Sequence, residues 1–239
     1  MHILVDLFIL AVIAFCGWQG YKRGILGSVI AVVFIIIALY GGNLLARTYS
    51  EEFQSMFRPF IGGYLDRIEE ETAEQFLPAE FSMLSIEDLF AFEPDLEPTV
   101  VQEVFEGIGV YETRATRLTE QYLAMRAEND ELSVSRALTN VAVAAFCFLI
   151  VFIIGFLLLL IALTVLYNLV HLSFRLPGIQ RIDNIGGAVL GTVQGVMLVL
   201  VLAWAVGYLG LLLPESIPGR TWFLEFFVRH NPMVSFISL

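Results

Sequence analysis

The sequence predicts an all-α integral membrane protein. We expect four transmembrane helices, arranged as two antiparallel hairpins, with a helical acidic extramembrane insertion between the second and third helices. Of the 239 residues, 58% are hydrophobic and 15% are charged, against about 45–50% and about 25% in ordinary soluble domains. The apolar residues gather in four runs, and three of these reach the roughly 20 residues that a helix needs to cross a bilayer.

Residues 1–46 are predicted to form the first hairpin. Its spans are Ile3 to Trp18 and Ile25 to Ala46, and the short connection QGYKRG joins them. The chain starts MHILVDLF, which lacks the basic region of a cleaved signal peptide, so we expect the first span to be retained.

Residues 138–213 are predicted to form the second hairpin, from Leu138 to Leu172 and from Ile185 to Leu213. The first of these spans would be about 52 Å long as one helix. It therefore has to tilt in the membrane or project from it, and we expect projection at its Arg136 end. Pro214 is expected to end the last span.

Basic residues in the two short connections predict the orientation. They are Lys22, Arg23, Arg175 and Arg181. Dense positive charge favours the cytoplasmic side, although arginines also flank the other ends of the spans. We therefore expect a bacterial inner (plasma) membrane protein whose termini and acidic segment are extracytoplasmic.

The segment from residue 47 to 137 carries 20 acidic residues and seven arginines. This balance argues against nucleic-acid binding. We expect a cap of short amphipathic helices that binds an envelope protein, with boundaries near Pro59, Pro78, Pro94 and Pro98. The patterns Ser85 to Asp88 and Thr99 to Gln102 resemble capping boxes. Apolar residues recur at helical spacing between Val110 and Leu132.

The densest acidic cluster is Glu69, Glu70, Glu71 and Glu74. Because the spacing of a calcium loop is missing, a solvated helix face is the preferred interpretation.

In the tail, residues 214–239, Trp222, Phe223, Phe226 and Phe227 share one helical face. That face predicts either an amphipathic helix at the membrane interface or a helix packed on the acidic cap.

Glycines recur every fourth residue at Gly187, Gly191 and Gly195. In lipid, such a face lets two helix backbones approach closely. We expect packing within the four-helix unit, with a homodimer seam or a pore lining as the alternatives. Further glycines stand in the two connections, and we interpret them as turn residues: Gly20, Gly24 and Gly178.

Two aspartates lie in or beside the spans. Asp183 precedes the fourth span and is predicted to cap that helix, near Lys22 or Arg23 of the other connection. Asp6 lies inside the short first span, either at headgroup depth or as a buried functional carboxylate. Both could instead handle protons or ions, and the topology predicts that they lie at opposite faces of the membrane.

Nothing in the sequence indicates an enzyme. The three histidines are far apart, and the motifs HExxH, GxSxG, the P-loop and the dinucleotide fingerprint are missing. Cys16 and Cys147 lie in apolar runs and are expected to be small buried side chains. We expect no cofactor and no metal.

The arrangement of Asp6, the turn Gly20 to Gly24 and the run LPGIQRIDNIGGAVLGTVQG resembles the colicin V production protein family. The entry to the last span, with Arg181, Asp183, Gly187, Ala188 and Gly191, is similar to an Arg-x-Asp-x-x-Gly-Ala-x-x-Gly-like pattern of that family. The resemblance covers roughly residues 1–46 and 138–213. The acidic segment is longer than expected for a compact member.

The resemblance implies a multi-pass membrane protein needed for toxin (colicin or bacteriocin) production or export and linked to envelope homeostasis and biofilm behaviour. Two mechanisms fit the residues. The preferred one is a membrane scaffold that presents the acidic cap to an envelope partner. The alternative is a small oligomeric ion or proton channel or transporter that uses Asp6 and Asp183.

Overall fold

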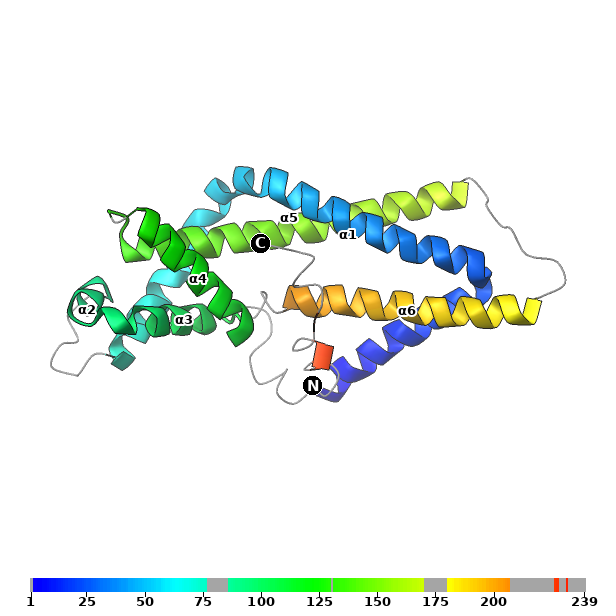
Figure 1. Ribbon diagram of the computed structural model, residues 1–239, viewed down its shortest axis with the longest axis horizontal. Helices are drawn as coiled ribbons and strands as arrows, with labels where there is room; N and C mark the ends of the chain where they lie inside the picture. The colour runs from blue at the N-terminus through cyan, green and yellow to red at the C-terminus, as the bar shows by residue number, and fades with distance from the viewer. Residues whose placement is uncertain are drawn as a thin grey trace. The chain divides into compact units, whose positions relative to one another are not determined.

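The computed structural model describes residues 2–76, 86–129, 131–169, 180–206, 226–227 and 231. Within these ranges all regular structure is helical, which confirms the all-α part of the predicted class. The elements are α1 (His2–Phe76), α2 (Ile86–Phe92), the short 3₁₀ helix η2 (Pro94–Leu96), α3 (Glu97–Gly107), α4 (Glu112–Glu128), α5 (Val134–Leu169) and α6 (Gln180–Val206) (Figure 1). Three of the described helices, α1, α5 and α6, are long and apolar enough to cross a membrane.

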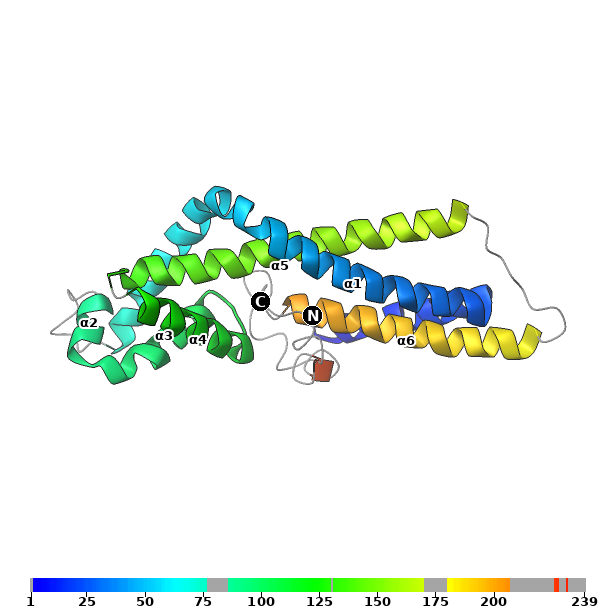
Figure 2. The same cartoon turned by 45° about the horizontal axis from the view of Figure 1, so that its top comes forward.

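Helix α1 is interrupted at Gly24. This glycine has φ 77° and ψ −178°, whereas the rest of α1 is helical. The hydroxyl of Ser28 donates a hydrogen bond to the carbonyl oxygen of Gly20 at 3.3 Å, although residues eight apart in a straight helix are separated by about 12 Å along its axis. The chain therefore turns sharply at Gly24, as Figure 2 also shows. We call residues 2–23 the N-terminal arm and residues 25–76 the C-terminal arm.

The chain divides into two compact units. In the described ranges, the first unit contains residues 2–48, 150–169, 180–206, 226–227 and 231, and the second contains residues 49–76, 86–129 and 131–149. Helices α1 and α5 each contribute to both units. The described part of the acidic segment predicted from the sequence, residues 47–137, lies almost entirely in the second unit.

The first unit leaves many large apolar side chains uncovered. Leu158 and Leu166 of α5 are 62% and 57% exposed, and Ile185 of α6 is 62% exposed. Soluble proteins rarely leave apolar patches of this extent open to water. Lipid tails would cover such residues, so these helices suit a bilayer. Inside the unit, Phe152 and Trp204 are fully buried and their ring centroids lie 4.9 Å apart.

The C-terminal arm and α5 approach each other closely at small residues. A β-carbon on Gly42 would lie 3.1 Å from the backbone nitrogen of Phe156, and one on Gly155 would lie 3.0 Å from the Leu45 side chain. Close approach at glycines is the usual way in which helices pack in lipid.

The second unit has a core of its own. Val100, Val101, Val104 and Phe105 of α3 are buried, as are Leu118 and Tyr122 of α4. The Tyr122 hydroxyl donates a hydrogen bond to Glu97 Oε1 at 2.7 Å, and Arg126 lies 3.7 Å from the same oxygen. These contacts join the start of α3 to the end of α4.

Helix α1 continues far beyond the expected end of the second span. The prediction that Pro59 ends a helix was wrong, since Pro59 lies inside α1. A proline removes one amide donor, and the burial of Leu65 and Ile68 in the second unit favours continuation of the helix. The packing there is close, because a β-carbon on Gly107 of α3 would lie 2.7 Å from Ile68 Cγ2.

Two further boundaries differ from the expected ones. The capping box predicted at Thr99 was wrong, because α3 begins at Glu97 with Leu96 as N-cap and a proline in the first turn. Proline suits a first turn, whose amides have no intrahelical partner. The helix expected between Val110 and Leu132 is α4, which is shorter at both ends. Ser85 lies outside the described residues.

Glu69 departs from the predicted solvated face, whereas Glu70 and Glu71 are exposed. Its Oε2 is buried and has no hydrogen-bond partner among the described residues. Burial is the main reason why the pKa of Glu69 is raised to about 7; the neighbouring carboxylates of Asp66 and Glu87 raise it further, and a hydrogen bond with Ser135 lowers it. In the folded second unit, Glu69 therefore keeps its proton up to about pH 7.

We predict that the second unit loosens as the pH rises through about 7. A raised pKa means that the folded state binds the proton more tightly, so this contribution is complete below the ordinary pKa of 4.5 and is lost through about 7. Hydrogen exchange of α2 and of the start of α5, corrected for intrinsic rates, should be faster at pH 8 than at pH 5.5. Glu69→Gln should remove most of this difference.

Glu70→Gln is the matched control, because Glu70 is an exposed neighbour on the same helix. It should leave the pH dependence of exchange unchanged. An equal loss of pH dependence in both variants would show that Glu69 is not the responsible group.

Candidate functional site

The candidate site lies where α6 meets the break in α1. Oδ1 of Asp183 accepts a hydrogen bond from the backbone N–H of Ile25 at 2.9 Å, and Asp183 is only 8% exposed. Ile25 is the first residue after the break, so its amide is one of those that a helix start leaves without an intrahelical partner. The Asp183 carboxylate therefore caps the C-terminal arm of α1, whereas the sequence analysis assigned it to the start of its own helix.

Gly24 is required at this position for two reasons. Its φ of 77° is a backbone conformation that residues with a side chain rarely adopt. A β-carbon there would also lie 2.3 Å from Oδ2 of Asp183. The carboxylate thus occupies the space that a side chain at residue 24 would need.

Ser28 connects three helical segments. Its fully buried hydroxyl is 3.1 Å from the carbonyl oxygen of Gly187 and 3.3 Å from that of Gly20. In lipid, a hydroxyl that bridges backbone carbonyls is a helix-to-helix contact. Ser28 was not predicted from the sequence; its position four residues after Gly24 in an apolar run was the available signal.

The glycine face of α6 packs against the N-terminal arm of the same chain. A β-carbon on Gly187 would lie 2.4 Å from the carbonyl oxygen of Gly20, and one on Gly191 would lie 2.4 Å from that of Cys16. For Gly195, the nearest atom is Ile13 Cα at 2.9 Å. The two backbones are thus in direct contact over about two turns of α6.

The predicted charged residues do not form one cluster. Lys22 Nζ lies over the Trp18 ring at 3.4 Å from its centroid, a cation–π contact. Arg181 is exposed. Asp6 is half-buried, and it precedes Gly24 by 18 residues, about 27 Å along a helix. Gly178 lies outside the described residues.

The tail is described only in part. Phe227 packs on a small core cluster of Ile9, Val199 and Ala203. The Asn231 side chain donates a hydrogen bond to the carbonyl oxygen of Leu200 at 2.9 Å. These residues contact α6 and the N-terminal arm of α1 in the first unit. The aromatic face predicted for residues 222 and 223 lies outside the described residues.

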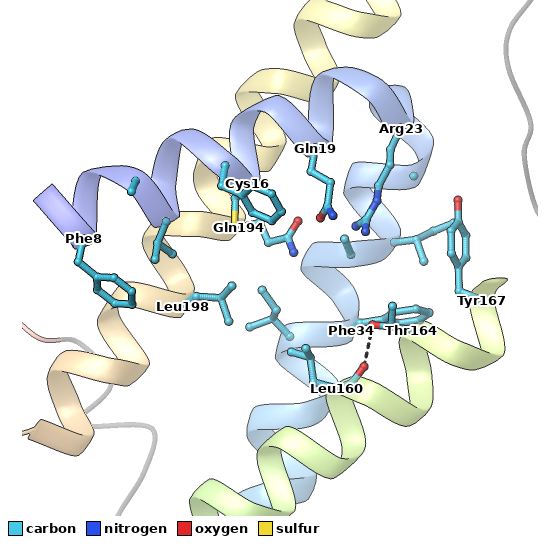
Figure 3. Close-up of a pocket in the computed structure, with 17 residues that line it drawn as sticks. Phe8, Cys16, Gln19, Arg23, Phe34, Leu160, Thr164, Tyr167, Gln194 and Leu198 are labelled. Atoms are coloured by element: carbon cyan, nitrogen blue, oxygen red, sulfur yellow. Dashed lines mark hydrogen bonds between the residues drawn. The ribbon is translucent and has the colours of Figure 1, made fainter.

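A cavity of about 690 Å³ lies in the first unit, lined by both arms of α1, by α5 and by α6 (Figure 3). Its walls are mainly apolar, but Gln19, Arg23 and Gln194 also line it. From the sequence, Arg23 was assigned to the orientation of the turn and to a position near Asp183, and both glutamines were missed. Gln194 inside an apolar run, and Gln19 directly after one, were the signals that could have indicated them. Among the described residues, no group of three His, Cys, Asp or Glu could hold a metal ion.

We predict that the glycine face tolerates no β-carbon. Gly191→Ala should lower the midpoint of thermal unfolding of the detergent-solubilised protein, because overpacking typically costs about 1–3 kcal/mol. Gly63→Ala is the control: Gly63 is also helical, but a β-carbon there meets nothing within 4 Å. Equal unfolding midpoints for the two variants would contradict close packing of the glycine face against the N-terminal arm.

We also predict that residue 183 needs an acceptor more than a charge. Asp183→Asn keeps an oxygen that can accept from the Ile25 amide, so it should fold with a modest loss of stability. Asp183→Leu should leave that buried amide unpaired, at a cost of about 1–3 kcal/mol. Thermal unfolding and size-exclusion chromatography measure the stability and the folding of both variants. Equal losses of stability in Asp183→Asn and Asp183→Leu would refute the cap.

A comparison with known protein families matches part of the chain. Residues 118–232 match the family model of the Colicin V production protein. The matched segment includes Asp183 and the glycine face, and the resemblance drawn from the sequence is therefore confirmed over these residues. The turn at Gly20 to Gly24 and Asp6 lie outside it. The chain matches no curated protein and no solved structure.

Proposed function

We propose that this chain, which over residues 118–232 belongs to the Colicin V production protein family, acts as a scaffold in the inner membrane of a bacterium. Its role would be in toxin production or export and in envelope homeostasis, with consequences for biofilm behaviour. In this proposal it catalyses no reaction and presents the second unit to an envelope protein.

The observation that carries the scaffold proposal is the engagement of Asp183. The carboxylate is buried and bonded to the Ile25 amide, and its second oxygen lies against Gly24. A proton- or ion-handling carboxylate in a membrane faces a water-filled path or its substrate. Asp183 instead holds helices together, which supports a structural role.

We propose four membrane crossings: the N-terminal arm, the first part of the C-terminal arm to about residue 46, the apolar part of α5, and α6. The sharp turn at Gly24 supports two crossings within α1. The positive connections Lys22–Arg23 and Arg175–Arg181 support a cytoplasmic position for that end. The termini and the second unit are then extracytoplasmic.

The partner surface is proposed to be acidic. The second unit has a folded core, and acidic side chains on its α3 and α4 helices are exposed: Glu103, Glu112, Glu120 and Glu128. Surface charge of one sign attracts a partner of the opposite sign. A basic surface on an envelope protein is therefore the expected complement.

Transport is the second candidate, and the cavity favours it. Polar side chains inside a membrane-spanning region commonly mark substrate pathways, and Gln19, Arg23 and Gln194 line this cavity. The transport hypothesis drawn from the sequence used Asp6 and Asp183. Because Asp183 is engaged in the cap, Asp6 is the carboxylate that remains for transport. Since four helices enclose only a narrow path, this candidate implies an oligomer.

Ion and proton flux into liposomes that contain the purified chain separates the two candidates. The scaffold proposal predicts no flux above that of empty liposomes under an imposed potential, with or without Asp6→Asn or Asp183→Asn. Flux that appears with the protein and falls in either variant would refute the scaffold and establish transport.

Toxin release tests the acidic surface. In a host that lacks its own family member, the chain should restore release, and Glu103→Gln with Glu120→Gln and Glu128→Gln should lower it severalfold at equal membrane abundance. A matched control changes Glu51, Glu52 and Glu70 to Gln, which are exposed acids of α1. Equal release from both triple variants would exclude α3 and α4 as the partner surface.

A further inference from the structure

The cavity of the first unit has a polar end and an apolar end. Arg23 is the residue before the break, and Gln19 precedes it by one helical turn (Figure 3). The walls farther from the break are apolar, with Phe8, Ile35 and Leu198. The chemistry of the lining therefore changes along the N-terminal arm from a cation and amides to hydrocarbon.

The Arg23 side chain is held beside the cavity by close packing. A β-carbon on Gly27 would lie 3.0 Å from Arg23 Cβ and 3.3 Å from the Tyr167 hydroxyl. Gly27 thus makes room for both the stem of the arginine and the tyrosine of α5. The guanidinium makes no ion pair with any described residue, so the cation has no anionic partner in the described part of the chain.

The other hydroxyl at this end is already engaged. Thr164 donates to the carbonyl oxygen of Leu160 at 2.7 Å, as Figure 3 shows. The Gln19 and Gln194 amides have no hydrogen-bond partner among the described residues. One cation and two amides are therefore available to a ligand.

The cavity is open toward the side of the helices. Phe8 and Phe15, which line it, are 60% and 54% exposed. In a bilayer, such exposed rings contact lipid tails. A ligand can thus enter laterally from the membrane without crossing a polar surface.

We propose that this cavity binds one anionic phospholipid of the cytoplasmic leaflet. The phosphate lies at Arg23, with the Gln19 amide as a further donor, and an acyl chain extends toward Phe8 and Leu198. From residue 23 to residue 8 a helix spans about 22 Å, enough for a headgroup and a leaflet that is about 15 Å of hydrocarbon. Basic pockets between membrane helices on the cytoplasmic side are known to suit acidic headgroups.

The charge at one end of the cavity and the length of its apolar wall favour an anionic phospholipid. A neutral phospholipid would place its own cation beside Arg23, which like-charge repulsion disfavours. A free fatty acid also has an anionic head. It differs from a phospholipid in having a single acyl chain and no further group attached to its head. The leaflet assignment rests on the proposed orientation, whereas the binding itself depends on neither the scaffold role nor toxin release.

Native mass spectrometry of the full chain, released from detergent, tests the proposal. Separate samples receive phosphatidylglycerol, phosphatidylcholine with the same acyl chains, or palmitate. The unmodified chain should retain phosphatidylglycerol at least tenfold more than phosphatidylcholine. Arg23→Gln should lose that preference, and Arg23→Lys, which keeps the charge, should retain most of it.

Two further variants separate the cavity from the general charge of this end. Arg181→Gln removes an exposed arginine of α6 that does not line the cavity and should bind as the unmodified chain does. Ala31→Phe adds a ring at a buried lining residue and should abolish retention of phosphatidylglycerol. Thermal unfolding in detergent establishes that each variant is folded.

Several results would overturn the proposal. These are equal retention of the two phospholipids by the unmodified chain, retention unchanged in folded Arg23→Gln or Ala31→Phe, and loss in Arg181→Gln as large as in Arg23→Gln. Preferential retention of palmitate over phosphatidylglycerol would make the occupant a free fatty acid and refute the phospholipid.

Discussion

The arrangement of the first unit depends on one buried contact between a carboxylate and a backbone amide. Asp183 of α6 accepts from the Ile25 amide, at the point where Gly24 interrupts α1. An interruption leaves amides and carbonyls without intrahelical partners, and burying such a group unpaired costs about 1–3 kcal/mol. The buried Asp183 carboxylate and the Ser28 hydroxyl bond to groups of this kind, so the turn can be packed against α6.

The same contact explains the glycine face. Once α6 supplies a cap to the turn, its backbone lies against the N-terminal arm, and only glycine fits at residues 20, 187 and 191. Hydrophobic burial adds little between helices in lipid, so close backbone packing has to supply the stability. The cap and the glycine face are therefore two parts of one interface between α1 and α6. This interface fixes the end of the N-terminal arm, and so it determines where Arg23 lies in the neighbouring cavity.

Much of this could be predicted from residue patterns, and the limits have physical causes. The helical class and the apolar character of α5 and α6 follow from composition and run length, and the spacing of Gly187, Gly191 and Gly195 indicates a helix-packing face. The partner of Asp183 could not be predicted, because an acidic residue before a helix fits a local cap equally well. Only the three-dimensional arrangement pairs it with Ile25, 158 residues away in the sequence.

Errors in the second unit have a similar origin. Pro59 has the local signature of a helix end, but the burial of Leu65 and Ile68 outweighs one missing hydrogen bond. Glu69 belongs to an acidic run that looks solvated, yet tertiary packing half-buries it near Asp66 and Glu87 and buries its Oε2 atom. Gln19 and Gln194 were missed because a single amide beside or inside an apolar run carries no motif. In each case, distant residues determine the environment.

A double-mutant cycle between residues 24 and 183 tests the central contact most directly. It compares the unfolding free energies of Gly24→Ala, Asp183→Ala and the double variant in one detergent. If Asp183 occupies the space of a β-carbon at residue 24, the loss in the double variant should be smaller than the sum of the single losses by more than about 0.5 kcal/mol. Losses that add within about 0.3–0.5 kcal/mol would show that the two residues are independent and would contradict the account.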